Sequence, residues 1–335
     1  MKKHKIITLG EILMRLSPIR HKRFGQTTEY ETYYGGAELN VASSLGNYGM
    51  DVSMVSVLPQ HDIADDALMH MRKFGIDTTN VLRAEGRLGL YFVEAPSMQR
   101  GGKVIYDRAD SVFTQAEVDT FDWDAIFEGT TWFHWSGITP AVSESAALIT
   151  AKALEVAEAK GLKVSMDYNY RAKLWQWGKS HEEVMPALME KCHVMSGIHP
   201  DVDVLNEEVT DLDFALSGKA MMEKYPNCEV VVFSSRGVKS ANHHTWAGAL
   251  FDGEKVYRTK KYELSHIVDR VGGGDAFMAG VIYGLHAFEG DFQQCIDFAT
   301  AASAFKHGID GDFNAVKKEE VMQMISSADF SKVDR

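Results

Sequence analysis

The sequence is poor in cysteine, and its few cysteines are scattered. Its 335 residues include three, Cys192, Cys228 and Cys295, and no two of them form a Cys-x-x-Cys pair. An odd number at such spacing argues against a disulfide framework and against a structural zinc site. A reducing compartment fits these residues best, so we expect a cytoplasmic protein.

The sequence also has too few basic residues to offset its acidic ones. It contains 35 Lys and Arg against 47 Asp and Glu, which gives a formal net charge of −12. Nucleic acids and anionic membranes bind to protein surfaces of positive potential, so this excess of acidic residues disfavours both as partners. If the substrate is anionic, the positive charge that holds it must be local.

Hydrophobic runs long enough to cross a bilayer are lacking. The longest run, 276–285, is about half of the ~20 residues that a transmembrane helix needs. The basic N-terminus is followed by an apolar stretch that Gly10 and Glu11 interrupt, with no small-residue cleavage site behind it. We therefore expect neither a transmembrane segment nor a signal peptide.

Apolar, β-rich stretches alternate with helical patterns along most of the chain. This order is typical of βα units around a parallel sheet, so the sequence predicts an α/β fold with a mostly parallel central sheet. The predicted strands cover 5–14, 51–58, 131–138, 162–168, 193–197 and 229–235. The predicted helices cover 37–48, 63–74, 143–160, 181–191, 276–287, 292–307 and 317–325.

Two strand patterns, 88–94 and 103–109, interrupt the alternation. A turn that contains proline and glycine separates them, and no helix lies between them, so they should pair as a hairpin outside the parallel sheet. We expect one domain over 1–335 that carries a small β lid, formed by about 15–35 and 87–110.

The stretch 268–277 is the most informative for chemistry. Three consecutive glycines, Gly272, Gly273 and Gly274, precede Asp275 and an apolar helix. Such glycines allow bare N–H groups to converge on an anion at a helix N-terminus, where the helix dipole favours negative charge. An aspartate in the first turn could then take a proton from an attacking hydroxyl during phosphoryl transfer. The alternative is a tight loop whose aspartate caps the helix.

Other phosphate-binding motifs are absent from the sequence. Gly178-Lys179-Ser180 has Lys173 where a P-loop needs its first glycine, and no Gly-x-Gly-x-x-Gly occurs. A Walker-type nucleotidase and a dinucleotide-dependent dehydrogenase are therefore both disfavoured.

The Gly-Gly-Gly-Asp loop and the stretch 35–42 together resemble the two signatures of the ribokinase-like, or phosphofructokinase-B-type, sugar kinases. The resemblance covers almost the whole chain, with the landmarks in family order. Further stretches are similar to the branch of that family that phosphorylates 2-keto-3-deoxygluconate: 10–18, 106–108, 133–138, 167–171 and 268–275.

The resemblance implies a three-layer α/β/α kinase that uses ATP and Mg²⁺, with K⁺ as a further candidate cofactor. Its expected substrate is the terminal 6-hydroxyl of 2-dehydro-3-deoxy-D-gluconate. Asp275 matches the family's catalytic base, and Gly272, Gly273 and Gly274 match its anion hole. Asp269 matches a position near the nucleotide and the monovalent-cation loop.

The same resemblance assigns two groups of binding residues. Those on the sugar side are Gly35, Gly36, Asn40, Tyr91, Tyr106, Arg108, Ile138, Asn169, Arg171 and Asp312. Those on the nucleotide side are Ser196, Ser234, Arg236, Gly237, Asp269, Gly272 and Gly274. Asp310 is the alternative to Asp312 as the late aspartate on the sugar side, and either could instead be a turn residue.

A sugar acid carries a carboxylate, and an acidic protein needs fixed cations to hold it. Arg108 and Arg171 lie close to tyrosines in the sequence and could supply planar, bidentate donors. A neutral sugar makes no such demand. The alternative for each arginine is a solvated surface charge.

Two departures from the family pattern concern the nucleotide side. An Asn-x-x-Glu motif is expected near 197–201, where the sequence reads Gly-Ile-His-Pro-Asp, so Asp201 or Asp203 would have to supply an oxygen ligand for Mg²⁺. The stretch 234–237 also differs from the usual Thr-x-Gly. No metal ligand is therefore assigned.

Three alternatives remain at this point. The chain could phosphorylate another sugar, such as fructose, tagatose or a related aldonic acid, or it could be a catalytically silent sugar-binding or regulatory homologue. The exposed strands of the lid also favour a homo-oligomer built through the lid.

Overall fold

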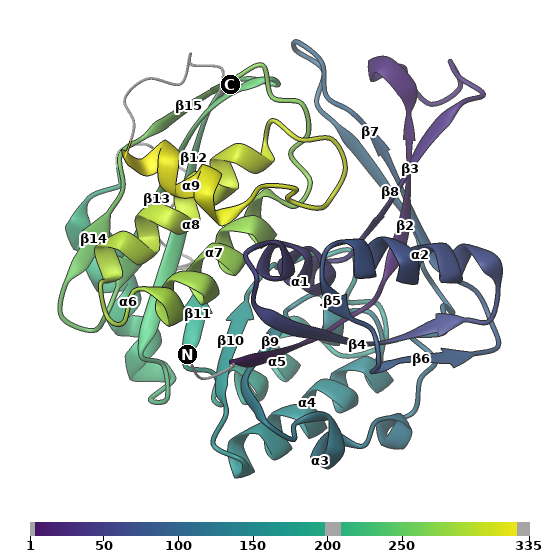
Figure 1. Ribbon diagram of the computed structural model, residues 1–335, viewed down its shortest axis with the longest axis horizontal. Helices are drawn as coiled ribbons and strands as arrows, with labels where there is room; N and C mark the ends of the chain where they lie inside the picture. The colour runs from purple at the N-terminus through teal and green to yellow at the C-terminus, as the bar shows by residue number, and fades with distance from the viewer. Residues whose placement is uncertain (1–3, 198–208, 327–335) are drawn as a thin grey trace.

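The computed structural model describes residues 4–197 and 209–326 (Figure 1). Within them, eleven strands form one central sheet in the order β14-β13-β12-β11-β10-β9-β1-β4-β5, with β15 beside β13 and β6 beside β4. Neighbouring strands pair in parallel from β12 to β6, whereas β13, β14 and β15 add an antiparallel edge. The mostly parallel sheet expected from the alternating pattern is confirmed.

The strands of this sheet are short, and most residues of its central members are buried. Their bounds are β1 Lys5–Leu9, β4 Asp51–Pro59, β5 Ile76–Asp77, β6 Val81–Ala84, β9 Thr130–Ser136, β10 Lys163–Asp167, β11 Val194–Ser196, β12 Val230–Ser240, β13 His243–Phe251, β14 Val256–Arg258 and β15 Tyr262–Ser265.

Helices cover both faces of the sheet, which gives the expected three layers (Figure 1). Successive strand residues point to opposite faces, so Ile6 packs into one core and Ile7 into the other. The first core holds α1 Ala37–Asn47, α2 Asp62–Lys73, α7 Gly273–Ala287, α8 Phe292–Lys306 and α9 Lys318–Ser326. The second holds α3 Trp123–Ile126, α4 Glu144–Ala159, α5 His181–Met189 and α6 Asp211–Lys224.

A separate four-stranded sheet forms the lid, in the order β3-β2-β7-β8. Its strands are β2 Leu13–Pro18, β3 Tyr30–Gly35, β7 Gly89–Glu94 and β8 Lys103–Asp107. The hairpin predicted from the turn between the last two strands is confirmed, because β7 and β8 pair antiparallel. The lid sheet projects beyond one end of the central sheet in Figure 1.

The single strand predicted over 5–14 is wrong, because the chain leaves the central sheet after Leu9 and enters the lid at Leu13. Gly10 occupies the break, where a Cβ atom would lie 2.1 Å from Oε2 of Glu38. This close approach requires a glycine between the two sheets. Periodicity alone does not reveal the break, because both strands are apolar.

The structure also contains elements that the sequence patterns did not indicate, namely β5, β6, β13, β14, β15, α3 and α6. Strands β5, β6, β14 and β15 are short and lie towards the edges of the central sheet, where hydrophobic patterns are weak. Strand β13 has nine residues and is mostly buried. No helix in the described ranges is both long and apolar enough to span a bilayer. The three cysteines are free and buried.

Candidate active site

One cavity of 780 Å³ opens between the lid and the carboxyl ends of the central strands. Its floor is built from β10, β11 and β12 and from the first turns of α1 and α7, and its roof is built from β7 and β8. Parallel strands expose their carboxyl ends at one edge of the sheet, and this edge is where α/β proteins bind their ligands. The residues that the sequence marked for chemistry therefore meet in one place.

The glycine loop forms the start of α7. Gly272 is the N-cap residue at φ 82°, and a Cβ atom there would lie 2.2 Å from the carbonyl oxygen of Asp312. The backbone hydrogen bond from Ala276 to Gly272 is the first of the helix, so the amides of Gly274 and Asp275 precede it. A Cβ at Gly274 would meet no atom within 4 Å, so the loop opens into the cavity. These features fit an anion at the helix N-terminus.

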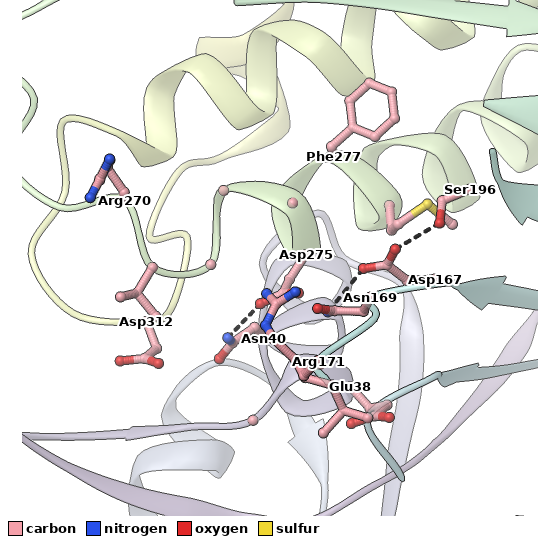
Figure 2. Close-up of a pocket in the computed structure, with 18 of the residues that line it drawn as sticks. Glu38, Asn40, Asp167, Asn169, Arg171, Ser196, Arg270, Asp275, Phe277 and Asp312 are labelled. Carbon is pink, nitrogen blue, oxygen red and sulfur yellow. Dashed lines mark hydrogen bonds between the residues drawn. The ribbon is translucent and has the colours of Figure 1, made fainter. Parts of the chain in front are cut away.

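Asp275 lies in the first turn of α7 with a carboxylate that is 9% exposed. It does not cap the helix, because its Oδ2 accepts a hydrogen bond of 2.7 Å from Nδ2 of Asn40 on α1 (Figure 2). Burial and, to a smaller extent, the nearby charges of Asp167 and Glu38 raise the pKa of Asp275, and the Asn40 contact lowers it; the net result is a pKa of about 8. A carboxylate of this basicity is a stronger proton acceptor than an exposed aspartate.

Two further carboxylates border the cavity near Asp275. Asp167, at the end of β10, accepts hydrogen bonds from Oγ of Ser196 at 2.7 Å and from Nδ2 of Asn169 at 3.1 Å (Figure 2). Asn169 holds a left-handed conformation, φ 38°, which turns the chain directly behind this strand. Glu38 is buried, and its Oε1 accepts from the Ser136 amide and from the hydroxyls of Ser136 and Thr139. Burial raises the pKa of both carboxyls.

The arginines of the cavity differ in whether they already have a carboxylate partner. Arg108 is buried, and its guanidinium pairs with Glu11 through Nε at 2.7 Å and through Nη2. Arg171, Arg236 and Arg270 line the cavity without an ion pair to any residue of the described chain. In addition, Nε of Arg236 is buried without a hydrogen-bond partner in that part of the chain. Buried donors of this kind fit an anionic ligand.

The structure brings most of the residues predicted from the sequence to this cavity. Those that line it are Gly36, Asn40, Tyr91, Tyr106, Arg108, Ile138, Asn169, Arg171, Ser196, Ser234, Arg236, Gly272, Gly273, Gly274, Asp275 and Asp312. Tyr91 and Tyr106 stack with ring centroids 6.2 Å apart on the lid.

Three of the residues predicted to contact ligands do not line the cavity. Gly35 packs against Asp312, where a Cβ atom would lie 2.3 Å from its Oδ2. Gly237 lines a much smaller neighbouring cavity, because it lies further along β12. Asp269 lies behind the glycine loop, where it pairs with Arg15 at 2.7 Å.

The choice between the two late aspartates is decided by burial. Asp312 is buried and lines the cavity, whereas Asp310 is exposed and does not. Asp201 and Asp203, which the sequence offered as oxygen ligands for Mg²⁺, lie outside the described residues. In the ranges that are described, no three His, Cys, Asp or Glu side chains gather as a metal site.

Sequence reasoning missed Glu11, Glu38, Asp167 and Arg270, which all line the cavity. Glu38 and Arg270 stand inside the two signature stretches, and Asp167 ends a predicted strand, so each carried a positional signal. Glu11 stands inside the matched stretch 10–18, but its pairing with Arg108, 97 residues away in the sequence, had no local signal.

Known proteins share the sequence and the fold of this chain. The model of the pfkB family carbohydrate kinases matches residues 3–314. The crystal structure of 2-dehydro-3-deoxygluconokinase from Thermotoga maritima is 40% identical, with a TM-score of 0.90, over 97% of this chain and 100% of that one. The 2-dehydro-3-deoxygalactonokinase of Haloferax volcanii is 29% identical over 99% of both chains. The fold is shared with a fructokinase from Xylella fastidiosa, solved with bound ATP, at 20% identity and a TM-score of 0.74 over 97% of this chain and 99% of that one.

Proposed function

The chain belongs to the pfkB family of carbohydrate kinases, and we propose that it transfers the terminal phosphoryl group of ATP to the 6-hydroxyl of 2-dehydro-3-deoxy-D-gluconate. The observation that carries this proposal is that Asp275 lies beside the glycine loop in a cavity that also holds Arg171, a cation with no ion pair among the described residues. The likeness to the Thermotoga maritima enzyme over nearly the full length of both chains supports the substrate.

The proposed chemistry follows from the position of Asp275. Its carboxylate accepts the proton of the sugar hydroxyl as that oxygen attacks the phosphoryl group, and Asn40 holds it in place through the 2.7 Å contact. The bare amides at the start of α7 stabilise the charge of the transferring group. The lid covers the cavity and excludes water, which limits the loss of ATP to hydrolysis.

The charges of the cavity favour an acid over a neutral sugar. Arg171 is an exposed residue in the loop between β10 and α5, and its only hydrogen bond within the described chain goes to the Tyr170 carbonyl. Its guanidinium is thus free to bind a carboxylate in a bidentate manner. Arg108 lies in the same cavity, but Glu11 already offsets its charge, so in this proposal Arg171 carries more of the sugar carboxylate.

The described residues include cations that could bind the phosphates of ATP, but they do not form a metal site of their own. Arg236 and Arg270 border the end of the cavity near the glycine loop, where phosphates would lie. Mg²⁺ bound to ATP would neutralise part of the phosphate charge, and such ions keep several water and phosphate ligands. Asp167 is the described carboxylate best placed to contact that hydrated ion, because it lies at a strand end inside the cavity.

A second candidate substrate is 2-dehydro-3-deoxygalactonate, which the Haloferax volcanii relative favours. The two sugar acids are epimers, so the same carboxylate and the same terminal hydroxyl would occupy the site. Their discrimination depends on the side chains that meet one ring or chain hydroxyl. Turnover on both acids at similar kcat/KM would extend the proposal to the pair.

The test is ADP release with Mg-ATP and each of five acceptors: the two dehydro-deoxy acids, gluconate, fructose and ribose. We expect turnover on one or both dehydro-deoxy acids to exceed that on the neutral sugars by at least tenfold. Turnover on fructose or ribose alone would contradict the sugar-acid assignment. Binding of an acid without ADP release would indicate the silent sugar-binding homologue.

We also infer a homo-oligomer built through the lid, in a cytoplasmic protein. The face of the lid that points away from the cavity carries apolar side chains from three strands, namely Met14, Leu16, Leu90, Phe92 and Ile105. Strand β8 is an exposed edge, with Ile105 41% exposed. Exposed apolar faces beside a free strand edge are places where copies of a chain pair. Buried free cysteines and ATP dependence support the location.

A further inference from the structure

A buried cluster of four charged side chains lies directly behind the glycine loop. Arg15 comes from lid strand β2, Asp269 precedes the loop, Lys306 ends α8, and Asp312 follows α8. Nη1 of Arg15 lies 2.7 Å from Asp269 and 3.2 Å from Asp312. The cluster therefore connects the lid, the loop and the end of α8.

Asp269 fixes the backbone on both sides of the cluster. Its Oδ1 accepts a hydrogen bond of 3.0 Å from the Val271 amide, at the entrance of the glycine loop. Its Oδ2 accepts one of 3.2 Å from the Gly311 amide, in the segment after α8. A change of charge in the cluster would thus shift the backbone of the glycine loop, which in the proposed mechanism faces the transferring phosphate.

Lys306 is the unexpected member of the cluster. Its side chain is fully buried, and its Nζ donates a hydrogen bond of 2.9 Å to the Ile309 carbonyl. A Cβ atom on Gly272 would lie 3.3 Å from Cε of Lys306, so the ammonium group stands beside the first residue of the loop. Burial lowers the pKa of this amine, while the charges of Asp269 and Asp312 oppose that effect.

The charges of the cluster already balance. Arg15 and Lys306 supply two positive charges, and Asp269 and Asp312 supply two negative ones. A K⁺ ion added beside Asp269 would introduce a buried charge without a counter-ion, which is costly. The Ile309 carbonyl, an oxygen of the kind that such an ion needs, is already occupied by Lys306. The described residues therefore do not fit the K⁺ that the sequence resemblance suggested.

We propose that Lys306 supplies, from within the chain, the positive charge behind the glycine loop, so that the enzyme needs no bound monovalent cation. Lys306 is a positioning residue in this proposal, because it contacts the loop rather than the reacting atoms. The inference rests on the proposed kinase activity for its kinetic test, but its thermal test needs no turnover.

The first experiment uses the unmodified chain. Turnover and melting temperature are measured in KCl, NaCl and tetramethylammonium chloride at one ionic strength. We expect turnover to agree within about twofold among the three salts and the melting temperature to show no K⁺-specific rise. A K⁺-specific gain of fivefold or more in turnover, or a saturable K⁺-specific rise in melting temperature, would overturn the proposal.

The second experiment replaces the charge. Lys306→Ala should lower kcat about 10- to 100-fold, because the glycine loop is displaced, whereas KM for the sugar can change only through Asp312, the cluster member that lines the cavity. Methylammonium or K⁺ should restore part of that loss and raise the melting temperature of the variant, since either ion can enter the vacated space. Lys152→Ala, on the exposed face of α4, is the matched control.

An unchanged kcat in Lys306→Ala would contradict the proposal, as would a loss that neither cation restores. If the variant does not fold, the salt experiment on the unmodified chain decides alone. If no sugar is phosphorylated at all, the proposed function fails. The melting temperatures of the unmodified chain and of Lys306→Ala in the three salts then still test whether Lys306 takes the place of a bound cation.

Discussion

In the proposed mechanism, Asp275 is a buried acid that must release its proton before it can accept one from the sugar. Its pKa is raised to about 8, mainly by burial. Since only the ionised form accepts a proton, we expect kcat/KM to rise about tenfold per pH unit below pH 8 and to level off above it. A profile from about pH 6 to about pH 9.5 checks this expectation. A flat profile over that range would contradict it.

Replacement of the same residue separates catalysis from stability. Asp275→Asn should lower turnover about 10²- to 10⁴-fold, because it removes the proton acceptor. Because the pKa of Asp275 is raised in the folded state, the free energy of unfolding falls as pH rises from about 4 to about 8, and the loss is complete above that range. The variant should therefore melt at a higher temperature than the native chain at about pH 8.5. Turnover near normal would exclude the base, and Asp310→Asn is the exposed control.

Arg171 is the residue on which the choice of a sugar acid rests. Arg171→Ala should lower kcat/KM for the acid about 10- to 100-fold, the value of a hydrogen bond to a charged group, and affect a neutral sugar less than about threefold. Kinetics on both substrates measure the difference. Equal losses would argue against a contact with the carboxylate. Arg83→Ala, at an exposed ion pair with Asp65, serves as the control.

Arg108 is less suited to that experiment, although it lines the same cavity. Its removal would leave Glu11 buried without its cation, and a buried unpaired charge destabilises the fold. A loss of activity in Arg108→Ala could therefore come from weaker substrate binding or from a less stable fold, and the experiment would not separate the two. The structure separates two arginines that look equivalent in the sequence.

At the scale of elements, α7 is held in place by its close packing against α8. A Cβ atom on Gly280 would lie 2.5 Å from the Cα of Ala299, and one on Gly284 would lie 2.8 Å from the Cα of Cys295. The two helices approach so closely because these glycines have no side chains. The N-terminus of α7, which is the proposed anion site, takes its position from this contact.

Gly280→Val should therefore destabilise the fold by about 1–3 kcal/mol, because the added methyl groups force the two helices apart. Chemical denaturation measures the free energy of unfolding. Gly101→Val is the matched control, since a Cβ atom there meets nothing within 4 Å, and it should change stability by less than about 0.5 kcal/mol. Equal effects of the two substitutions would contradict this account of the α7–α8 contact.

At the scale of the whole molecule, the lid meets the main body at more than one place. Arg15 and Tyr91 of the lid contact Asp312, and the carbonyl of Met98 in the β7–β8 turn accepts a hydrogen bond of 3.2 Å from Ala241 between β12 and β13. The lid thus contacts the main body both near Asp312 and near the β12–β13 turn. Its opposite, apolar face is the surface through which we infer that two copies of the chain pair.

Ile105→Asp should weaken the oligomer, because it places a charge in the apolar face of the lid. Light scattering after size exclusion measures the mass, and we expect the variant to shift to the monomer at concentrations where the native chain is associated. Leu148→Asp on α4 provides a matched control, since Leu148 is similarly exposed on another face. A native chain that is monomeric at all concentrations would rule out the inferred assembly.

The sequence by itself determined the fold class, the hairpin of the lid and the glycine loop, because each depends on local patterns. Alternating strand and helix patterns can be recognised without information on distant contacts. Three adjacent glycines before a helix predict an anion site. The family resemblance drawn from these motifs is confirmed by the family match over 3–314.

Only the tertiary structure decided which charges are free. Arg108 is paired because Glu11, from a distant segment, reaches it, while Arg171 is not paired within the described chain. Lys306 reads as an ordinary helix-ending lysine, yet folding buries it beside Asp269 and Asp312. The availability of a charge depends on partners that are far apart in the sequence, so the packed chain is needed to reveal it.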